Sequence, residues 1–207
     1  IRTDEGEAWP NLQYHFLPMA VSYDGSSSAV CHGFQAHIGP MRPESHGRLT
    51  LRDANPKSVP HFTFNYMGTE RDRFEMRQGV KLTREIIAQS PFNRYRGKEL
   101  GPGPHVQSDA EIDAWVRENG ESAYHPCSTC RMGHDDDAVV DGEGRVHGVE
   151  ALRVIDASIM PRITTGNLNA PTIMMAEKLA DAVRGRTPLT PASPGWYEPS
   201  NWQSSQR

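Results

Sequence analysis

The sequence predicts an α+β fold in which an antiparallel sheet is flanked by helices. Four short runs of alternating apolar and polar residues occupy the first third of the chain, and two segments with helical spacing follow them. Because the strands come first and the helices second, the pattern favours separate layers over alternating βα units. The 18 glycines and 16 prolines imply many turns and disfavour a helical bundle.

The four alternating runs span residues 12–17, 34–38, 47–52 and 61–66. Successive side chains of a strand point to opposite faces, so each run presents one apolar and one polar face. Such alternation is typical of an antiparallel sheet with one solvated side. Proline removes a ladder donor, which suits strand ends, and prolines separate the runs at Pro40, Pro43, Pro56 and Pro60.

Two helices are expected next, at residues 70–89 and 108–120. The first carries apolar side chains along one side and ends at Ser90-Pro91. The second begins with a capping box, formed by Ser108 and Glu111, and ends at Gly120. Together with the four strands, these helices make up the expected sheet-and-helix layer over residues 11–119.

The remainder of the chain is expected to hold short strands, one long helix and a tail. The strands are predicted at residues 145–147 and 152–155, the second leading into a small polar turn. A helix is predicted from about residue 171 to 184, with proline in its first turn and Gly185 after its end. Residues 187–207 are rich in proline and lack periodicity, which predicts an extended tail.

Charge and hydropathy exclude several classes of protein. The 22 basic and 26 acidic residues give a net charge of −4 without long blocks, which argues against a nucleic-acid partner. No apolar run approaches the roughly 18 residues of a transmembrane helix. The three cysteines, Cys31, Cys127 and Cys130, are too few for a disulfide scaffold and fit a reduced cytoplasmic setting.

The segment from His125 to His134 contains two histidines and a Cys-x-x-Cys pair and allows several interpretations. His125, Cys127, Cys130 and His134 have the side chains of a zinc site, although they leave no second arm to close a longer loop. A redox pair would need a strand before it and a helix after it. In a third interpretation His125, fixed by Pro126, is an acid–base catalyst, and in a fourth it is an ordinary surface histidine.

Two further polar segments suggest contact with a ligand. Asp156, followed by Ala157, ends an expected strand, where a carboxylate among small residues can approach a nucleotide. Capping of the turn by Asp156 or Ser158 is the alternative. Asn167 and Asn169 precede the final helix, whose N-terminal N–H groups favour an anion or an electron-rich ring edge. Simple N-capping by Asn169 is the alternative there.

Several motifs in order resemble the carboxy-terminal part of the glucose–methanol–choline (GMC) flavoprotein oxidoreductases. They are YHPCSTCRMG and, after it, AVVDGEGRVHGVEALRVIDASIMPRITTGNLNAPTIMMAEKLAD. The match covers roughly residues 121–186 and is nearest to the choline-oxidising bacterial members. The sheet and helices before it are similar to the substrate domain of the same family.

The resemblance implies an FAD-dependent enzyme that oxidises an alcohol, with choline and its conversion to betaine aldehyde, for glycine betaine synthesis, as the expected reaction. His125 and Asn167 correspond to the two active-site positions of the family. Asp156 and Ala157 correspond to residues that meet the FAD diphosphate and ribityl region. Asn169 and Thr172 correspond to positions near the pyrimidine edge of the flavin. The resemblance implies no metal ligand.

The sequence departs from the family pattern in one motif. The G-x-G-x-x-G turn that begins the family's FAD domain does not occur in this sequence. We therefore expect a carboxy-terminal fragment with a substrate-binding domain (1–137), a segment completing the FAD domain (138–186) and a tail (187–207). Alone, it should be inactive and should self-associate.

Substrate and location are the last expectations. A quaternary ammonium needs an aromatic or acidic cage, for which Tyr14, Phe16 and Trp115 are candidates. The electron acceptor is left open between oxygen and a quinone or dye. The expected location is cytoplasmic, with membrane association through the electron-transfer chain as an alternative. A binding module without chemistry is the rival to the enzyme.

Overall fold

The computed structural model describes residues 1–20 and 32–205, so Cys31 lies outside the described residues. The chain divides into two compact units: unit 1 is Ile1–Glu121 together with Pro199–Arg207, and unit 2 is Ser122–Glu198. The boundary between them falls at Glu121, earlier in the chain than the expected boundary at residue 137. The three-part division expected for the parent enzyme stays a prediction.

Unit 1 contains the four strands that the alternating runs predict. Strands β1 (Leu12–Leu17) and β2 (Gln35–Pro40) pair antiparallel, with Leu12 opposite Pro40 and Leu17 opposite Gln35. Strands β3 (Arg48–Thr50) and β4 (His61–Thr63) form a second antiparallel pair. The α+β class with antiparallel pairing is confirmed, but the strands form two separate pairs instead of one sheet. Pro40, the last residue of β2, and Pro43, which follows the strand, lack the N–H groups that would continue a ladder.

Both predicted helices of unit 1 are present and end close to the expected residues. Helix α1 spans Glu70–Ala88. Thr69 caps its N-terminus, and the Thr69 side chain accepts a hydrogen bond from the N–H of Asp72. A one-turn 3₁₀ helix, η1 (Ser90–Phe92), follows it. Helix α2 spans Asp109–Asn119, and both halves of the Ser108–Glu111 capping box form.

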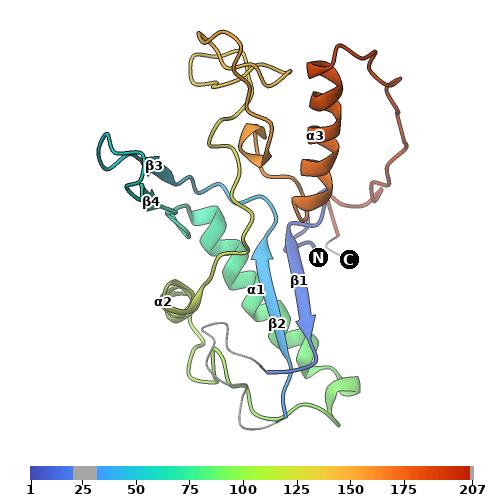
Figure 1. The fold of residues 1–207 in the computed structure, drawn as a ribbon. Helices are drawn as coiled ribbons and strands as arrows, with labels where there is room; N and C mark the ends of the chain where they lie inside the picture. The colour runs from blue at the N-terminus through green and yellow to red at the C-terminus, as the bar shows by residue number, and fades with distance from the viewer. Residues whose placement is uncertain (21–31, 206–207) are drawn as a thin grey trace. The chain divides into compact units, whose positions relative to one another are not determined.

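Helix α1 packs against the β1–β2 pair, and α2 packs against α1 (Figure 1). The contact is close because Gly79 of α1 has no side chain at the point where Ile38 of β2 approaches it. The core of the unit consists of Met67, Val80, Val106, Ile112 and Val116, with Ile38, Met76 and Trp115 packed against it.

Unit 2 is held together by a small core and three isolated β-bridges. Val140, Ile159 and Leu179 form the buried centre. The bridges join Met132 to Val140, Val140 to Val146, and Arg145 to Arg153. The strands expected at 145–147 and 152–155 are therefore reduced to single bridges. Left-handed turns at Gly144 and Gly148, both with φ of +74°, interrupt the backbone before either run can extend a ladder.

Two helical elements complete unit 2. A one-turn 3₁₀ helix, η2 (Ala157–Ile159), follows Asp156. Helix α3 spans Asn169–Val183 and so begins two residues before the expected start. It ends as predicted at Gly185, where φ is +65°, and the N–H of Arg186 donates to the carbonyl of Asp181 at 3.0 Å. This left-handed glycine termination satisfies the last carbonyls of the helix.

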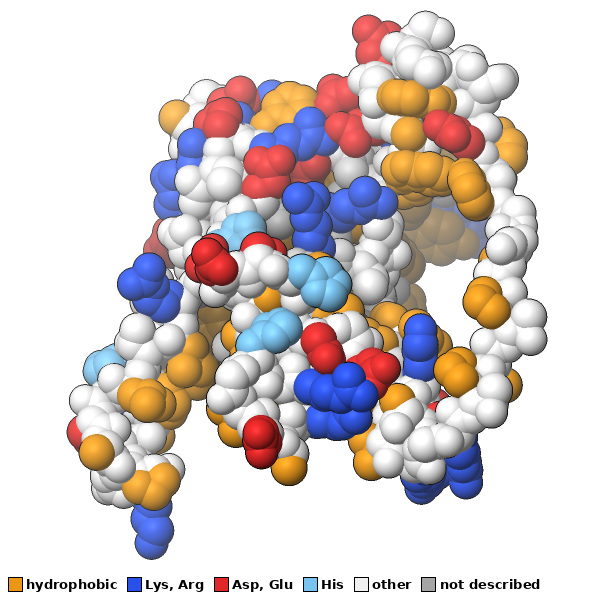
Figure 2. Space-filling model, turned by 90° about the horizontal axis from the view of Figure 1, so that it is seen from above, with side chains coloured by type: hydrophobic (Ala, Val, Ile, Leu, Met, Phe, Trp, Pro, Cys, Tyr) orange, Lys and Arg blue, Asp and Glu red, His pale blue; other side chains and the backbone are white. Residues whose placement is uncertain are grey.

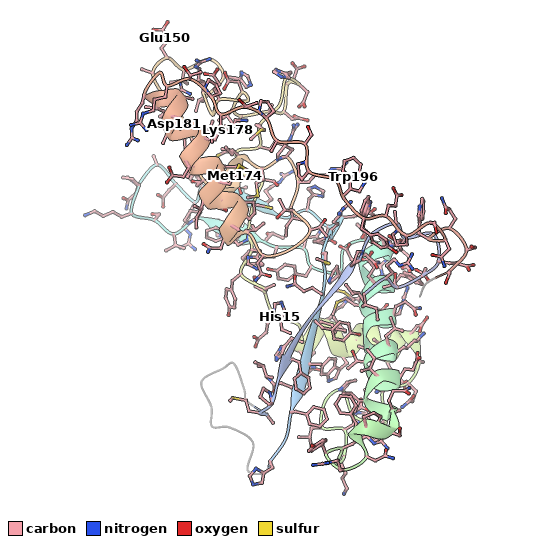
Figure 3. The ribbon with its side chains drawn as sticks, turned by 90° about the vertical axis from the view of Figure 1, so that its right-hand side faces the viewer. His15, Glu150, Met174, Lys178, Asp181 and Trp196 are labelled. Atoms are coloured by element: carbon pink, nitrogen blue, oxygen red, sulfur yellow. The ribbon has the colours of Figure 1, made fainter. Side chains whose placement is uncertain are left out.

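The tail combines an irregular stretch with a contact at its end. From Arg186 to Pro199 the chain has no helix or strand, as expected, and Trp196 is largely exposed (Figure 3). Further on, the carbonyl of Trp202 accepts the N–H of Gly6 at 2.8 Å, so the end of the tail belongs to unit 1. Among the described helices, none is long and apolar enough to cross a membrane.

Candidate functional site

His125 lies in an irregular segment of unit 2 whose backbone is held at several points. Tyr124, directly before it, has a left-handed φ of 59°, and its N–H donates to the Ser122 hydroxyl oxygen at 3.0 Å. The ring of Tyr124 is exposed, while His125 itself is half-buried. Pro126 restricts the conformation of His125 because its ring disfavours the helical region for the preceding residue.

Three backbone hydrogen bonds join the His125 segment to the η2 turn. The N–H groups of Ser128, Cys130 and Met132 donate to the carbonyls of residues 157, 158 and 159, at 3.4, 3.0 and 2.8 Å. Ile159 is fully buried, so the turn is anchored in the core of unit 2. The structure thereby brings the segment that carries His125 beside the turn that begins with Asp156 and Ala157.

Asp156 caps the η2 turn. Its backbone is extended, with φ of −157°, and its Oδ1 atom accepts the N–H of Ser158 at 2.8 Å. The capping alternative is thus confirmed for this side chain. Asp156 remains exposed, and Ala157 is half-buried, so a ligand can still approach the turn.

The Asn167–Thr172 segment forms the start of α3. Asn169 is the first helical residue and does not cap the helix, which corrects the N-capping alternative. Leu168 takes the capping position and is buried, so hydrophobic packing and not a side-chain hydrogen bond fixes where α3 begins. The N–H of Thr172 donates to the carbonyl of Leu168 at 2.9 Å. The first turn of α3 consequently has no side-chain cap.

The zinc interpretation of the His125–His134 segment finds no support in the described residues. No three histidine, cysteine, aspartate or glutamate side chains there are grouped closely enough to hold a metal ion. Cys127 and Cys130 are free thiols and half-buried. The redox-pair interpretation also fails, because neither a strand precedes nor a helix follows the two cysteines.

The three residues named as candidates for an ammonium cage have separate surroundings in unit 1. The Tyr14 hydroxyl donates to the carbonyl of Gly79 at 3.3 Å, and Trp115 packs against the core between α1 and α2. Phe16 is about half exposed and stacks at a tilt on Phe34, with ring centroids 5.6 Å apart. Tyr14 is therefore hydrogen-bonded to α1, and Trp115 packs in the core of unit 1.

A pair of histidines that belongs to none of the sequence motifs occupies the polar face of the β1–β2 pair. His15 of β1 and His37 of β2 are directly opposite partners in the ladder. His15 lies on the side of β1 away from α1 (Figure 3). Burial and the neighbouring His15 lower the pKa of His37 from its ordinary value of 6.5, and Glu121 opposes this. The signal was present in the period-two alternation of the strands, which puts both histidines on the solvated face.

The face shown in Figure 2 bears acidic and basic side chains interspersed with one another. Among the described side chains visible there, no continuous basic patch covers the surface. In unit 2, Arg131 and Asp135 form an ion pair at 2.5 Å.

Comparison with known proteins gives a consistent family assignment. The family model for GMC oxidoreductases matches residues 43–176. The "oxygen-dependent choline dehydrogenase" of Chromohalobacter salexigens is 59% identical over 197 residues, which are 95% of this chain and 35% of that protein. The chain thus spans about a third of the length of such relatives.

Solved structures agree with this assignment. Pyridoxine 4-oxidase from Mesorbium loti matches 86% of this chain and 35% of its own, with a TM-score of 0.78 and 28% identity. An FAD-dependent oxidoreductase from Chaetomium thermophilum matches 74% of this chain and 27% of its own, with a TM-score of 0.68 and 31% identity. The family model covers more than half of the sequence. The chain therefore belongs to the family of GMC oxidoreductases.

Proposed function

We propose that this chain is the carboxy-terminal part of an FAD-dependent alcohol dehydrogenase that oxidises choline to betaine aldehyde. The observation that carries the proposal is the 59% identity to a choline dehydrogenase over nearly the whole chain. It is supported by the hydrogen bonds that hold the His125 segment beside the Asp156–Ala157 turn. A site built from two segments distant in the sequence requires that they lie side by side. The function is argued from such a site because the fold alone does not determine it.

The residues of unit 2 fit a bound FAD. The first turn of α3 has no side-chain cap, so the N–H groups of Asn169 and Ala170 and the helix dipole can interact with a negatively charged or electron-rich group. Asn169 and Thr172 lie in that turn, and Asp156 and Ala157 form an exposed turn of the same unit. When bound, FAD supplies the acceptor for the hydride of the alcohol. Most of its binding surface is assigned to the part of the parent protein outside this chain.

His125 and Asn167 are assigned to the reacting alcohol. An imidazole nitrogen of His125 takes the hydroxyl proton, or stabilises the alkoxide as it forms, which increases the driving force for loss of the hydride. The amide of Asn167 donates a hydrogen bond to the same oxygen and orients it. The Pro126 ring restricts the backbone at His125, so the imidazole is positioned before the substrate arrives.

The chain by itself is assigned neither catalysis nor tight cofactor binding. A dinucleotide is held mainly by a glycine turn and a helix N-terminus facing its diphosphate, and the sequence has no such glycine motif. Exposed apolar side chains on unit 2 instead favour association between copies. A cytoplasmic location, with contact to a membrane-bound electron acceptor, is part of the proposal.

The test uses the full-length parent protein, purified with its flavin. Anaerobic addition of choline should bleach the flavin absorbance, whereas glycine betaine, which has no hydroxyl group to oxidise, should leave it unchanged. Betaine aldehyde should form in an amount equal to the flavin reduced. Bleaching by another alcohol but not by choline would overturn the substrate, and purification without flavin would overturn the cofactor.

A further inference from the structure

We propose that Asp156 is a positioning residue for His125, acting through the η2 turn and not through its charge on the cofactor. The inference rests on the proposed function of His125. It assigns to Asp156 a role different from the cofactor contact that the family resemblance implies. Two layers of hydrogen bonds carry this role, one within the turn and one between the turn and the His125 segment.

The first layer fixes the shape of the turn. Asp156 Oδ1 accepts the N–H of Ser158 at 2.8 Å, and its carbonyl accepts the N–H of Ile159 at 3.2 Å. Both bonds close the single turn of η2, which is too short to be stable from its backbone bonds alone. No cation of the described residues forms an ion pair with Asp156. The side chain is therefore used here as a hydrogen-bond acceptor.

The second layer transmits that shape to the His125 segment. The carbonyls of residues 157, 158 and 159 accept three N–H groups from Ser128, Cys130 and Met132. Only Pro126 and Cys127 separate His125 from the first of these bonds. If the turn opens, its carbonyl groups change direction. The His125 segment then loses the three hydrogen bonds that hold its backbone, and the imidazole is displaced.

Two substitutions can distinguish the Asp156 side chain as a hydrogen-bond acceptor from the same side chain as a negative charge acting on FAD. Asparagine caps a turn as well as aspartate does, because its side-chain oxygen accepts the same N–H. Alanine removes the acceptor altogether. A charge that acted on FAD would be lost equally in both variants. Asp156→Asn and Asp156→Ala therefore separate the two roles.

The experiment compares these variants in the full-length holoenzyme. Asp156→Ala should lower kcat by about 10- to 100-fold, as expected for a misplaced catalytic group, with KM for choline and FAD affinity changed by about twofold or less. Asp156→Asn should restore kcat to within about threefold of wild type. The matched control is Asp53→Ala, which removes an equivalent bond from the Asn55 N–H to Asp53 Oδ1, 2.8 Å long, in unit 1. It should leave all three quantities unchanged.

A second readout does not depend on activity. In hydrogen–deuterium exchange, the amides of Cys130 and Met132 should exchange faster in Asp156→Ala than in wild type, and at the wild-type rate in Asp156→Asn. Equal loss of kcat in the two Asp156 variants, or equal loss of FAD affinity, would overturn the proposal. Unchanged exchange in Asp156→Ala would overturn it as well. Full activity in His125→Gln would instead refute the proposed function, while the exchange result would still report on the turn.

Discussion

The backbone N–H of Cys130 donates to the carbonyl oxygen of Ser158 at 3.0 Å, in the middle of three bonds between an extended segment and a one-turn 3₁₀ helix. Neither residue has a role in the chemistry proposed for the site. Their contact nevertheless joins two sequence segments that carry candidate functional side chains, His125 on one and Asp156 on the other. The consequence is that substitutions in either segment are expected to act on the other.

Replacement of His125 tests its role in proton transfer. In the full-length enzyme, His125→Gln should lower turnover with choline by roughly 10²–10⁴-fold, because the amide can accept a hydrogen bond but cannot take the hydroxyl proton. The control is His134→Gln, an exposed histidine of the same segment, which should retain wild-type turnover. A steady-state assay with an artificial electron acceptor measures both. Full turnover in His125→Gln would remove the histidine from the chemistry.

The 207-residue chain alone should bind FAD weakly or not at all. Ordering the loops around a ligand costs on the order of 1–2 kcal/mol per fixed residue, while each hydrogen bond contributes a net of about 1 kcal/mol. The few contacts available from the backbone of the Asp156–Ala157 turn and from Asn169 do not offset that cost. Titration followed by flavin fluorescence measures the affinity. Micromolar or tighter binding by a monomer would show that the cofactor site lies mainly within this chain.

The same chain should self-associate through the exposed apolar side chains of α3. Ile173, Met174 and Val183 are each more than half exposed. Figure 3 shows Met174 on the same helix as the charged residues Lys178 and Asp181. Met174→Glu should lower the average mass in light scattering, because it removes an exposed apolar side chain from α3 and adds a charge beside Lys178 and Asp181. Leu189→Glu, at another exposed apolar position but on the tail, should leave the mass unchanged. A wild-type monomer at all concentrations would contradict the expectation.

Alanine substitutions at two glycines with the same φ distinguish the cost of a steric clash from the cost of backbone strain. Gly144 and Gly148 both have φ of +74°, so alanine costs about 1 kcal/mol at either position. A Cβ at position 144 would also lie 2.7 Å from the carbonyl oxygen of Val154, whereas nothing lies within 4 Å at position 148. Gly144→Ala should therefore lower the free energy of unfolding by about 1–3 kcal/mol more than Gly148→Ala. Urea denaturation measures the difference, and equal losses would be incompatible with this packing.

Glu75 should make the stability of unit 1 depend on pH. Its side chain is almost completely buried, and its Oε2 atom has no hydrogen-bond partner among the described residues. Burial raises the pKa of Glu75 above its ordinary value of 4.5, although hydrogen bonds from Asn11 and Arg71 counteract this. The folded state thus binds the proton more tightly than the unfolded state. The stabilisation is present below pH 4.5 and is lost as pH rises through the folded-state pKa.

The Glu75→Gln variant tests the direction in which the stability of unit 1 changes with pH. The free energy of unfolding of the variant, relative to wild type, should increase between about pH 4.5 and about pH 7.5, because glutamine cannot ionise. Glu70→Gln is the control: hydrogen bonds from Arg77 and Arg73 lower the pKa of that exposed carboxylate, so its contribution changes below about pH 4.5 and its relative stability should stay nearly constant over this range. Urea denaturation across this pH range compares them. A relative stability of Glu75→Gln that falls with pH would contradict the burial effect.

Local patterns in the sequence determined the elements of unit 1 and the family. Alternation placed the four strands, and the capping box placed the start of α2 at the residue observed, because the interactions that start a helix are made within one turn of it. The glycine at position 185 predicted the end of α3 for the same reason. The motif order around His125 and Asp156 identified the GMC resemblance without any knowledge of their contacts.

Only the tertiary structure decided how these elements meet. The runs at 145–147 and 152–155 alternate like strands, yet they form single bridges, because a strand needs a partner of matching length and the left-handed glycines interrupt it. Likewise, buried Leu168 and not Asn169 sets the start of α3. The bond from Cys130 to Ser158 and the pairing of His15 with His37 join residues far apart in the sequence. Periodicity describes one segment at a time, whereas such contacts depend on the register between two segments, which packing of the whole unit fixes.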